Sequence, residues 1–179
     1  MLGNVSRRRL ALELLMALSL TALFTGFGVI TVLRTTTFVN SSMVLVPMSD
    51  LDLAREADTI VLADVRGQAT RVAGVRHGVP SVFTDSKVDV IRVLKGSPAS
   101  SLTVTTSGGS ASGVIERNAD EASISTGDRV VLFLSTAPTG ETVVVGGIQG
   151  RYYVTGDSVS NEVHHGTLQG LIATVEASR

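Results

Sequence analysis

The chain contains no cysteine and few charged or aromatic residues. Without cysteine it cannot form a disulfide, a thiolate metal site or a thiol nucleophile, so three kinds of site are excluded together. Charged residues make up 17% of the 179 residues, against 44% hydrophobic residues. Residues 35–179 carry 11 Lys and Arg against 15 Asp and Glu. This acidic balance argues against nucleic acid or another polyanion as a partner.

One long apolar segment stands near the N-terminus. Leu10 to Leu33 is apolar except for Glu13, and the 20 residues from Leu14 to Leu33 carry no charge. As a helix these residues span about 30 Å, which matches the hydrocarbon core of a bilayer. Three arginines, Arg7 to Arg9, precede the segment, and only Arg34 follows it closely. This asymmetry predicts a cytoplasmic N-terminus and an exported C-terminal part.

The chain is therefore expected to have four parts. Residues 1–9 are cytoplasmic, residues 10–34 form a transmembrane signal-anchor helix, residues 35–48 form a stalk, and residues 49–179 form an extracytoplasmic domain. The lipid bilayer is then a partner through Leu14 to Leu33. A secreted domain, released by cleavage near Gly28, is the alternative. The anchor is favoured because the apolar region of a signal peptide is usually about 7–15 residues long.

The domain is expected to be organised around one long strand, Val82 to Gly96. Apolar and β-branched residues alternate with charged residues along its first half, the pattern of a half-buried strand. At Val90 and Ile91 the alternation changes phase, which predicts a β-bulge that bends the strand. Gly96 predicts a turn at its end, because glycine adopts positive φ readily.

The other elements complete a mainly β domain with short flanking helices. Further strands are expected at Thr59 towards Val72, Leu102 to Thr106, Arg129 to Ser135, Thr142 to Val145, Gln149 to Thr155 and Val159 to Val163. Loops are expected at Gly74 to Pro80 and at Ser110 to Gly127, the second with a short strand at Val114 and Ile115. Helices are expected at Ser49 to Ala57, where Ser49 and Asp52 form a capping-box pattern, and at Thr167 to Ala177, which has apolar residues at helical spacing. The apolar stretch from Arg129 to Ser135 should be buried on both faces.

Five segments carry a series of strand and turn patterns in a fixed order. They are Ala57 to Val65, Val88 to Gly96, Gly108-Gly109, Gly127 to Leu134 and Gly146 to Tyr152. In this order they resemble a recurrent bacterial exported domain that is similar to the barrel of netrin-type modules and tissue inhibitors of metalloproteinases. The resemblance implies a five-stranded OB-like barrel. It does not imply the inhibitors' mechanism, which needs a free N-terminal cysteine on the protease zinc and disulfides to brace it.

No motif for catalysis, a cofactor or a metal stands out, and none of these is expected. His164 and His165 are adjacent and would face opposite sides of a strand, which suits a metal poorly. The glycine pairs are not followed by the Gly-Lys-Ser/Thr of a phosphate loop, and there is no Gly-x-Ser-x-Gly elbow. An acid–base pair of carboxylates stays open, because nothing in the sequence selects a pair among the acidic residues.

The expected function is a membrane-tethered, extracytoplasmic binding module with a protein or envelope partner. Loops on a rigid scaffold are where specificity is usually placed. The predicted contact surface consists of Glu116, Arg117, Asp120, Glu121, Arg151 and Tyr152. The alternative for Tyr152 and Tyr153 is that one side chain lies in the core and the other faces solvent. The alternative for the loop from Ser110 to Gly127 is that it is solvated and has no partner. An envelope hydrolase with an unrecognised carboxylate site and a structural accessory of a membrane complex are the alternative functions.

Overall fold

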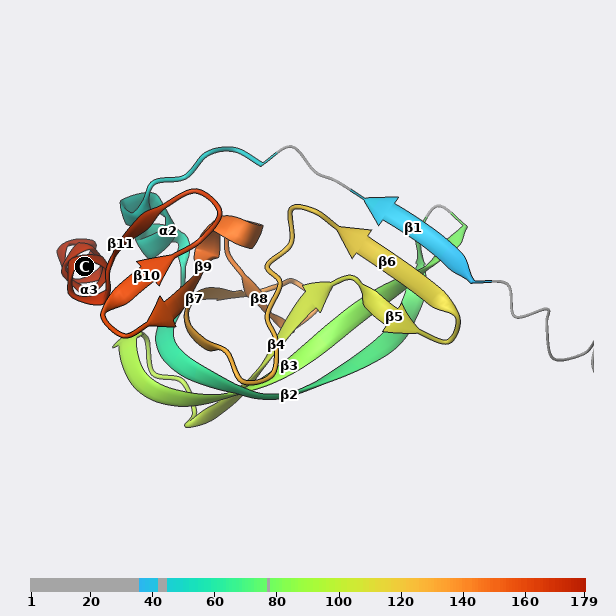
Figure 1. The fold of residues 1–179 in the computed structure, drawn as a ribbon, viewed down its shortest axis with the longest axis horizontal. Coiled ribbons are helices and arrows are strands. Elements are labelled where there is room, and N and C mark those ends of the chain that lie inside the picture. Colours follow the sequence, from blue (N-terminus) through green and yellow to red (C-terminus); the bar gives the residue numbers. More distant parts are fainter. Residues whose placement is uncertain (1–35, 42–44, 77) are drawn as a thin grey trace, which may run out of the picture. The chain divides into compact units, whose positions relative to one another are not determined.

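The part of the chain that this computed structural model describes, residues 36–41, 45–76 and 78–179, is mainly β, as the sequence predicts (Figure 1). Its strands are β1 (Thr37–Ser41), β2 (Thr59–Arg76), β3 (Val79–Lys95), β4 (Ser101–Ser107), β5 (Gly109–Ala111), β6 (Val114–Asn118), β7 (Arg129–Thr136), β8 (Thr142–Val144), β9 (Arg151–Thr155), β10 (Ser158–Ser160) and β11 (His165–Thr167). Its helices are α2 (Asp50–Glu56), the 3-10 helix η1 (Gly147–Gly150) and α3 (Leu168–Ala177).

The larger sheet has the strand order β11-β10-β9-β7-β2-β3-β4-β8, and β7 also pairs with β8. The pairings therefore run from β7 through β2, β3, β4 and β8 and return to β7. All are antiparallel except the pairing of β4 with β8, which is parallel and joins Val104 to Thr142. A smaller sheet has the order β1-β6-β5, with β1 parallel to β6.

The long hairpin of β2 and β3 confirms the organising strand and its bend. Leu62 pairs with Arg92, and the next residue, Ala63, pairs with Val90, so Ile91 is the extra residue of a bulge. Gly96 has a φ of 82°, and a Cβ there would lie 2.7 Å from the carbonyl oxygen of Asp58. Only glycine fits this turn.

The loop predicted at Gly74 to Pro80 is wrong. The register of the hairpin continues through the pairs of Val75 with Pro80 and Arg76 with Val79. Pairing of the two strands overrides the local preference of Gly74 and Pro80 for irregular backbone, because each pair adds ladder contacts.

Strand β7 lies between the two halves of the core. Residues 130–134 are all buried, which confirms the prediction. Val131 and Phe133 pack with α2 and α3, whereas Val130, Leu132 and Leu134 pack with the β2, β3 and β4 side chains of a second cluster. Successive residues of a strand point to opposite faces, so an uninterrupted apolar run fits a strand covered on both sides.

The two short helices predicted to flank the strands are present, and each is capped. The Ser49 hydroxyl accepts a hydrogen bond from the Asp52 N–H at 3.2 Å, and the Asp52 carboxylate accepts one from the Ser49 N–H at 3.3 Å, so the capping box is confirmed. Helix α3 begins after Thr167, whose hydroxyl accepts from the Gly170 N–H at 3.1 Å.

Several expected boundaries are corrected by pairings that join distant parts of the chain. Residues 37–41, expected within the stalk of residues 35–48, form β1 and pair with β6. In the region of the expected long loop, residues 109–111 form β5, which was not predicted, and residues 114–118 form β6, which confirms and extends the short strand predicted at Val114 and Ile115. The strand expected from Gln149 begins at Arg151 after η1, and the strand expected from Val159 to Val163 is β10, which ends at Ser160.

The predicted membrane-spanning segment of residues 10–34 lies outside the described residues. None of the helices that the structure does describe is long and apolar enough to cross a membrane.

Candidate functional site

Two adjoining cavities share Ser107 and Glu121 in their linings, and we call them together the Glu121 cleft. The first has a volume of about 500 Å³ and is lined mainly by hydroxyl, amide and carboxylate side chains. The second has a volume of about 520 Å³ and combines apolar side chains with carboxylates. The second is lined by Leu45, Phe83, Thr105, Ser107, Asp120, Glu121, Ala137, Thr139, Glu141, Val143, Val144, Gly146 and Gly147.

Hydroxyl groups of the β2–β3 hairpin hold the wall of the first cavity at residues 108–110, through hydrogen bonds to backbone carbonyls. The Thr84 hydroxyl donates to the Gly108 carbonyl at 2.7 Å, and the Thr70 hydroxyl donates to the Ser110 carbonyl at 2.8 Å. The backbone at Gly109 lies so close to β3 that a Cβ there would meet the Thr84 hydroxyl at 2.6 Å. A larger residue would push β5 away from the hairpin and open this wall.

Residues 121–125 also line the first cavity and are held in place. Ala122 and Ile124 are buried in the second core cluster. The Gln68 side-chain amide donates to the Ile124 carbonyl and to the Ser86 hydroxyl. The segment expected to be a free loop is thus attached through its side chains and its backbone, which favours one conformation over many.

Glu121 is the titratable residue at the junction of the two cavities. Burial raises the pKa of its carboxyl to about 6, and a hydrogen bond from the Ser107 backbone N–H partly opposes this rise. Removing a carboxylate from water disfavours its charged form, which accounts for the direction. A carboxyl with this pKa exchanges its proton just below neutral pH, so it can act as a donor or an acceptor towards a ligand.

An ion-pair network stands beside the second cavity. Arg71 donates to the Asp85 carboxylate at 2.8 Å and lies 3.5 Å from the Glu141 carboxylate, and its guanidinium carbon lies 5.3 Å from the centre of the Phe83 ring. The Thr105 hydroxyl also donates to Asp85, at 2.7 Å. The hydrogen bond from Arg71 is the main reason that the pKa of Asp85 is lowered. This network fixes the ring of Phe83 and the carboxylate of Glu141 in the cavity wall.

Four of the six residues predicted as a contact surface line the Glu121 cleft. Arg117 lines the first cavity, Asp120 the second, and Glu121 both. Glu116 also reaches the first cavity, but it is only 5% exposed, and one oxygen of its carboxylate accepts from the Val82 backbone N–H at 2.7 Å. Its prediction as an exposed contact is corrected, because β6 turns this side chain towards the hairpin.

Arg151 and Tyr152 are both 1% exposed, so their prediction as surface residues is corrected. Arg151 donates to the Ser123 carbonyl and the Tyr153 hydroxyl and pairs with Glu162, and its guanidinium carbon lies 4.0 Å from the centre of the Tyr153 ring. Its charge is thereby compensated beneath the segment that lines the cleft.

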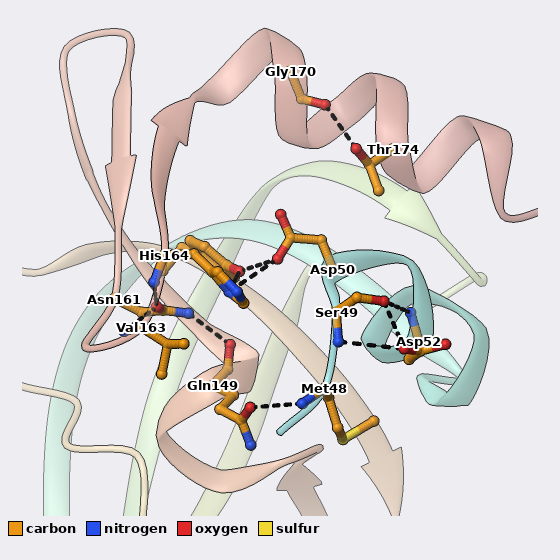
Figure 2. Close-up of polar contacts among 11 residues, drawn as sticks. Met48, Ser49, Asp50, Asp52, Gln149, Asn161, Val163, His164, Gly170 and Thr174 are labelled. Atoms are coloured by element: carbon orange, nitrogen blue, oxygen red, sulfur yellow. Dashed lines mark hydrogen bonds and ion pairs between the residues drawn. The ribbon is translucent and has the colours of Figure 1, made fainter. Parts of the chain in front are cut away.

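Tyr152 belongs to a separate polar cluster with Asp50 and His164, which are labelled in Figure 2. Its hydroxyl donates to the Asp50 carboxylate at 2.5 Å and lies 3.2 Å from Nδ1 of His164, which is also 3.2 Å from Asp50. Burial, followed by the contact with Asp50, raises the pKa of the tyrosine hydroxyl. The cluster joins the start of α2, β9 and the turn between β10 and β11, and it holds Tyr152 against Phe133, with their ring centres 5.9 Å apart. The hydrogen bond between Tyr152 and Asp50 holds the start of helix α2 against β9.

The same region is extended by a chain of amide contacts. Asn161 accepts from the N–H groups of Val163 and His164 at 2.8 and 2.6 Å and donates to the Gln149 carbonyl at 2.8 Å. The Gln149 side chain in turn accepts from the Met48 N–H at 2.9 Å (Figure 2). Within the residues described, no three His, Asp or Glu side chains are grouped so as to hold a metal ion.

Residues of the cleft that the sequence reasoning missed lie on the hairpin strands. Gln68, Thr70 and Thr84 line the first cavity. All three are polar residues at alternating positions of long strands, and a polar series on one face of a strand is the signal that would have indicated a polar cavity there.

No protein-family model matches this chain, and no curated protein matches it.

Proposed function

We propose that the chain is a membrane-tethered binding module that acts outside the cytoplasm and receives its partner in the Glu121 cleft. The tether is the apolar segment Leu14 to Leu33. The strands β2, β3, β4, β8 and β7 pair in this order, and β7 pairs again with β2. We take these five strands to be a barrel of OB type. The single parallel pairing, β4 with β8, supports this reading, because in an OB barrel the third and fifth strands are neighbours although a further strand separates them in sequence.

The position of the second cavity carries the binding function. OB barrels bind ligands on the face of their second and third strands and at the loops that join strands one to two and four to five. In the proposed barrel these are β3, β4, the β2–β3 turn and the β7–β8 turn. The second cavity is lined by Phe83 of β3, Thr105 of β4 and Thr139 of the β7–β8 turn. It therefore coincides with the binding face of this barrel type.

The lining of the cavity favours a protein segment or an uncharged envelope component over a polyanion. Leu45, Phe83 and Val143 offer an apolar wall, and Glu121 and Glu141 contribute the carboxylates. A nucleic-acid strand would bring phosphates against these carboxylates, whereas sites for single strands use basic grooves with stacked aromatic rings. An apolar side chain on a partner would instead bury its surface against the wall.

Site-specific photo-crosslinking tests the proposal in native membranes. A photoreactive amino acid replaces Thr139, an exposed residue at the edge of the cleft, and the matched control replaces Ala173, an exposed residue of α3. We expect a discrete crosslinked partner from Thr139 that Ala173 does not capture. If this crosslinked product disappears when the substitution Glu121→Lys is added, the partner contacts the cleft. Identical products from both positions, or none from Thr139, would contradict the proposal.

An envelope hydrolase is the second candidate, and one observation favours it. Glu116 and Glu121 both line the first cavity, and the pKa of Glu121 is raised to about 6, as in a carboxylic acid that donates a proton near neutral pH. Binding is nevertheless the preferred function. The Val82 N–H already occupies one oxygen of Glu116, the second carboxylate that a hydrolase would need. Hydrolysis of envelope glycans or peptides by the full chain, abolished by Glu121→Gln, would reverse this order.

A further inference from the structure

Three large apolar side chains are exposed around one end of the β2–β3 hairpin, and we call them the hairpin-tip surface. Phe38 of β1 is 67% exposed, Val72 of β2 is 39% exposed and Val75 of β2 is 70% exposed. In Figure 1 the start of β1 and the turn between β2 and β3 lie at the same end of the view, and α3 lies at the other end. We propose that this surface rests on the lipid bilayer, as a second membrane contact beside the tether.

Strand pairings and one hydrogen bond link the strands that carry these residues. Phe38 pairs with Ile115 of β6, and Ile115 pairs with Ser110 of β5. The Ser110 carbonyl accepts the hydrogen bond from Thr70 on β2. Neighbouring strands are about 4.8 Å apart, so β1 lies about 10 Å from β5, which is itself fastened to the hairpin. The two parts of the surface thus belong to one connected structure.

The short connection between the apolar segment and β1 indicates that the bilayer covers this surface. The apolar segment ends at Leu33, and β1 begins at Thr37. Four residues reach at most about 14 Å, so a tether in the bilayer holds the start of β1 at the membrane surface. This step rests on the tether of the proposed function. Phe38, the second residue of β1, is then placed where an exposed aromatic ring gains from the interface.

The charge distribution fits the same partner. The domain as a whole is acidic, yet residues 65–84 contain Arg66, Arg71 and Arg76 and no Asp or Glu. In the structure Arg66 and Arg71 pair with carboxylates outside this range, on Asp64, Asp85, Asp89 and Glu141. The tip itself therefore adds no negative charge towards the membrane. A surface with apolar side chains and without acids suits an anionic lipid headgroup layer.

Because the chain has no cysteine, single-cysteine variants give a direct test. The full chain is reconstituted into vesicles of phosphatidylcholine and phosphatidylglycerol, and an environment-sensitive fluorophore is attached at Val75→Cys. The matched control is Val163→Cys, since Val163 is also apolar and 50% exposed but lies by the turn between β10 and β11. A label at Leu23→Cys reports on the tether. Quenching by brominated lipids is measured for all three.

We expect the Val75 label to be quenched several-fold more than the Val163 label, and more strongly with phosphatidylglycerol than with phosphatidylcholine alone. A label at Val72→Cys should lose its quenching when Val75→Glu is added, while the circular-dichroism spectrum stays unchanged. Equal, weak quenching at Val75 and Val163 with a quenched Leu23 label would overturn this inference and leave the tether standing. An unquenched Leu23 label would overturn the tether and this inference together.

Discussion

The carboxyl of Glu121 should make stability depend on pH in a direction opposite to that of the acids with lowered pKa values, Asp52, Asp64, Asp85 and Glu141. Its pKa rises from 4.5 to about 6 on folding, so between these values the folded protein binds more protons than the unfolded chain. Stability therefore falls as pH rises through this window. A shift of this size corresponds to about 2 kcal/mol, at 1.36 kcal/mol per pKa unit. The cost is complete above pH 6 and absent below about pH 4.5.

The substitution Glu121→Gln removes this titration and keeps the size of the side chain. The free energy of unfolding is measured by urea denaturation of the full chain in mild detergent between pH 4 and pH 8, followed by circular dichroism. From pH 4 to pH 8, the free energy of unfolding of the variant should rise by about 2 kcal/mol relative to that of the unsubstituted chain. Comparing the two proteins at each pH cancels the contribution of Asp52, Asp64 and Asp85, whose pKa values are lowered. Glu176→Gln, at an exposed position of α3, is the control. If the Glu121→Gln curve stays parallel to that of the unsubstituted chain, Glu121 is not desolvated in the folded protein.

Three further results are expected. Phe133→Ala should cost about 3–5 kcal/mol in urea unfolding, because Phe133 is fully buried in β7; unchanged stability would contradict its place in the core. Lys95→Ala should cost about 1 kcal/mol, because the ammonium donates to the Ala54 carbonyl at 2.8 Å near the C-terminal end of α2, and a loss of α2 protection in hydrogen exchange would accompany it. A reporter active only outside the cytoplasm, fused after Arg179, should be active, with the full-length mass in the membrane fraction; a soluble product beginning near Val29 would refute the tether but not export.

Features of the fold that depend on neighbouring residues were predictable from the sequence. The capping box of Ser49 and Asp52 is formed within four residues. The bulge at Ile91 is visible as a change in the alternation of apolar residues, because the period of a strand is two and one extra residue reverses every side chain after it. The burial of β7 follows from an apolar run too short for a helix.

Features that depend on distant partners were not predictable in the same way. β1 is a strand because it pairs with β6, 77 residues later at Thr37 and Val114, and nothing in its own sequence identifies that partner. Glu116 and Arg151 were expected on the surface because ionised side chains are usually exposed. Each is buried against partners elsewhere in the chain, the Val82 N–H for Glu116, and the Ser123 carbonyl and the Glu162 carboxylate for Arg151. The patterns in a single sequence show composition and periodicity, but they do not show which distant residues contact each other.

The buried Arg151 nevertheless helps to hold one wall of the cleft. It donates to the Ser123 carbonyl and Gln68 donates to the Ile124 carbonyl, so two side chains hold consecutive carbonyl groups of the segment that lines the first cavity. An apolar residue of similar volume at position 151 would fill the space and avoid the desolvation cost of a buried charge, so stability could stay unchanged, but it would not hold the carbonyl. The advantage of the charged residue would then lie in preorganisation. A wall already fixed in one conformation does not have to be ordered when a partner binds, and the entropy so spared appears as affinity.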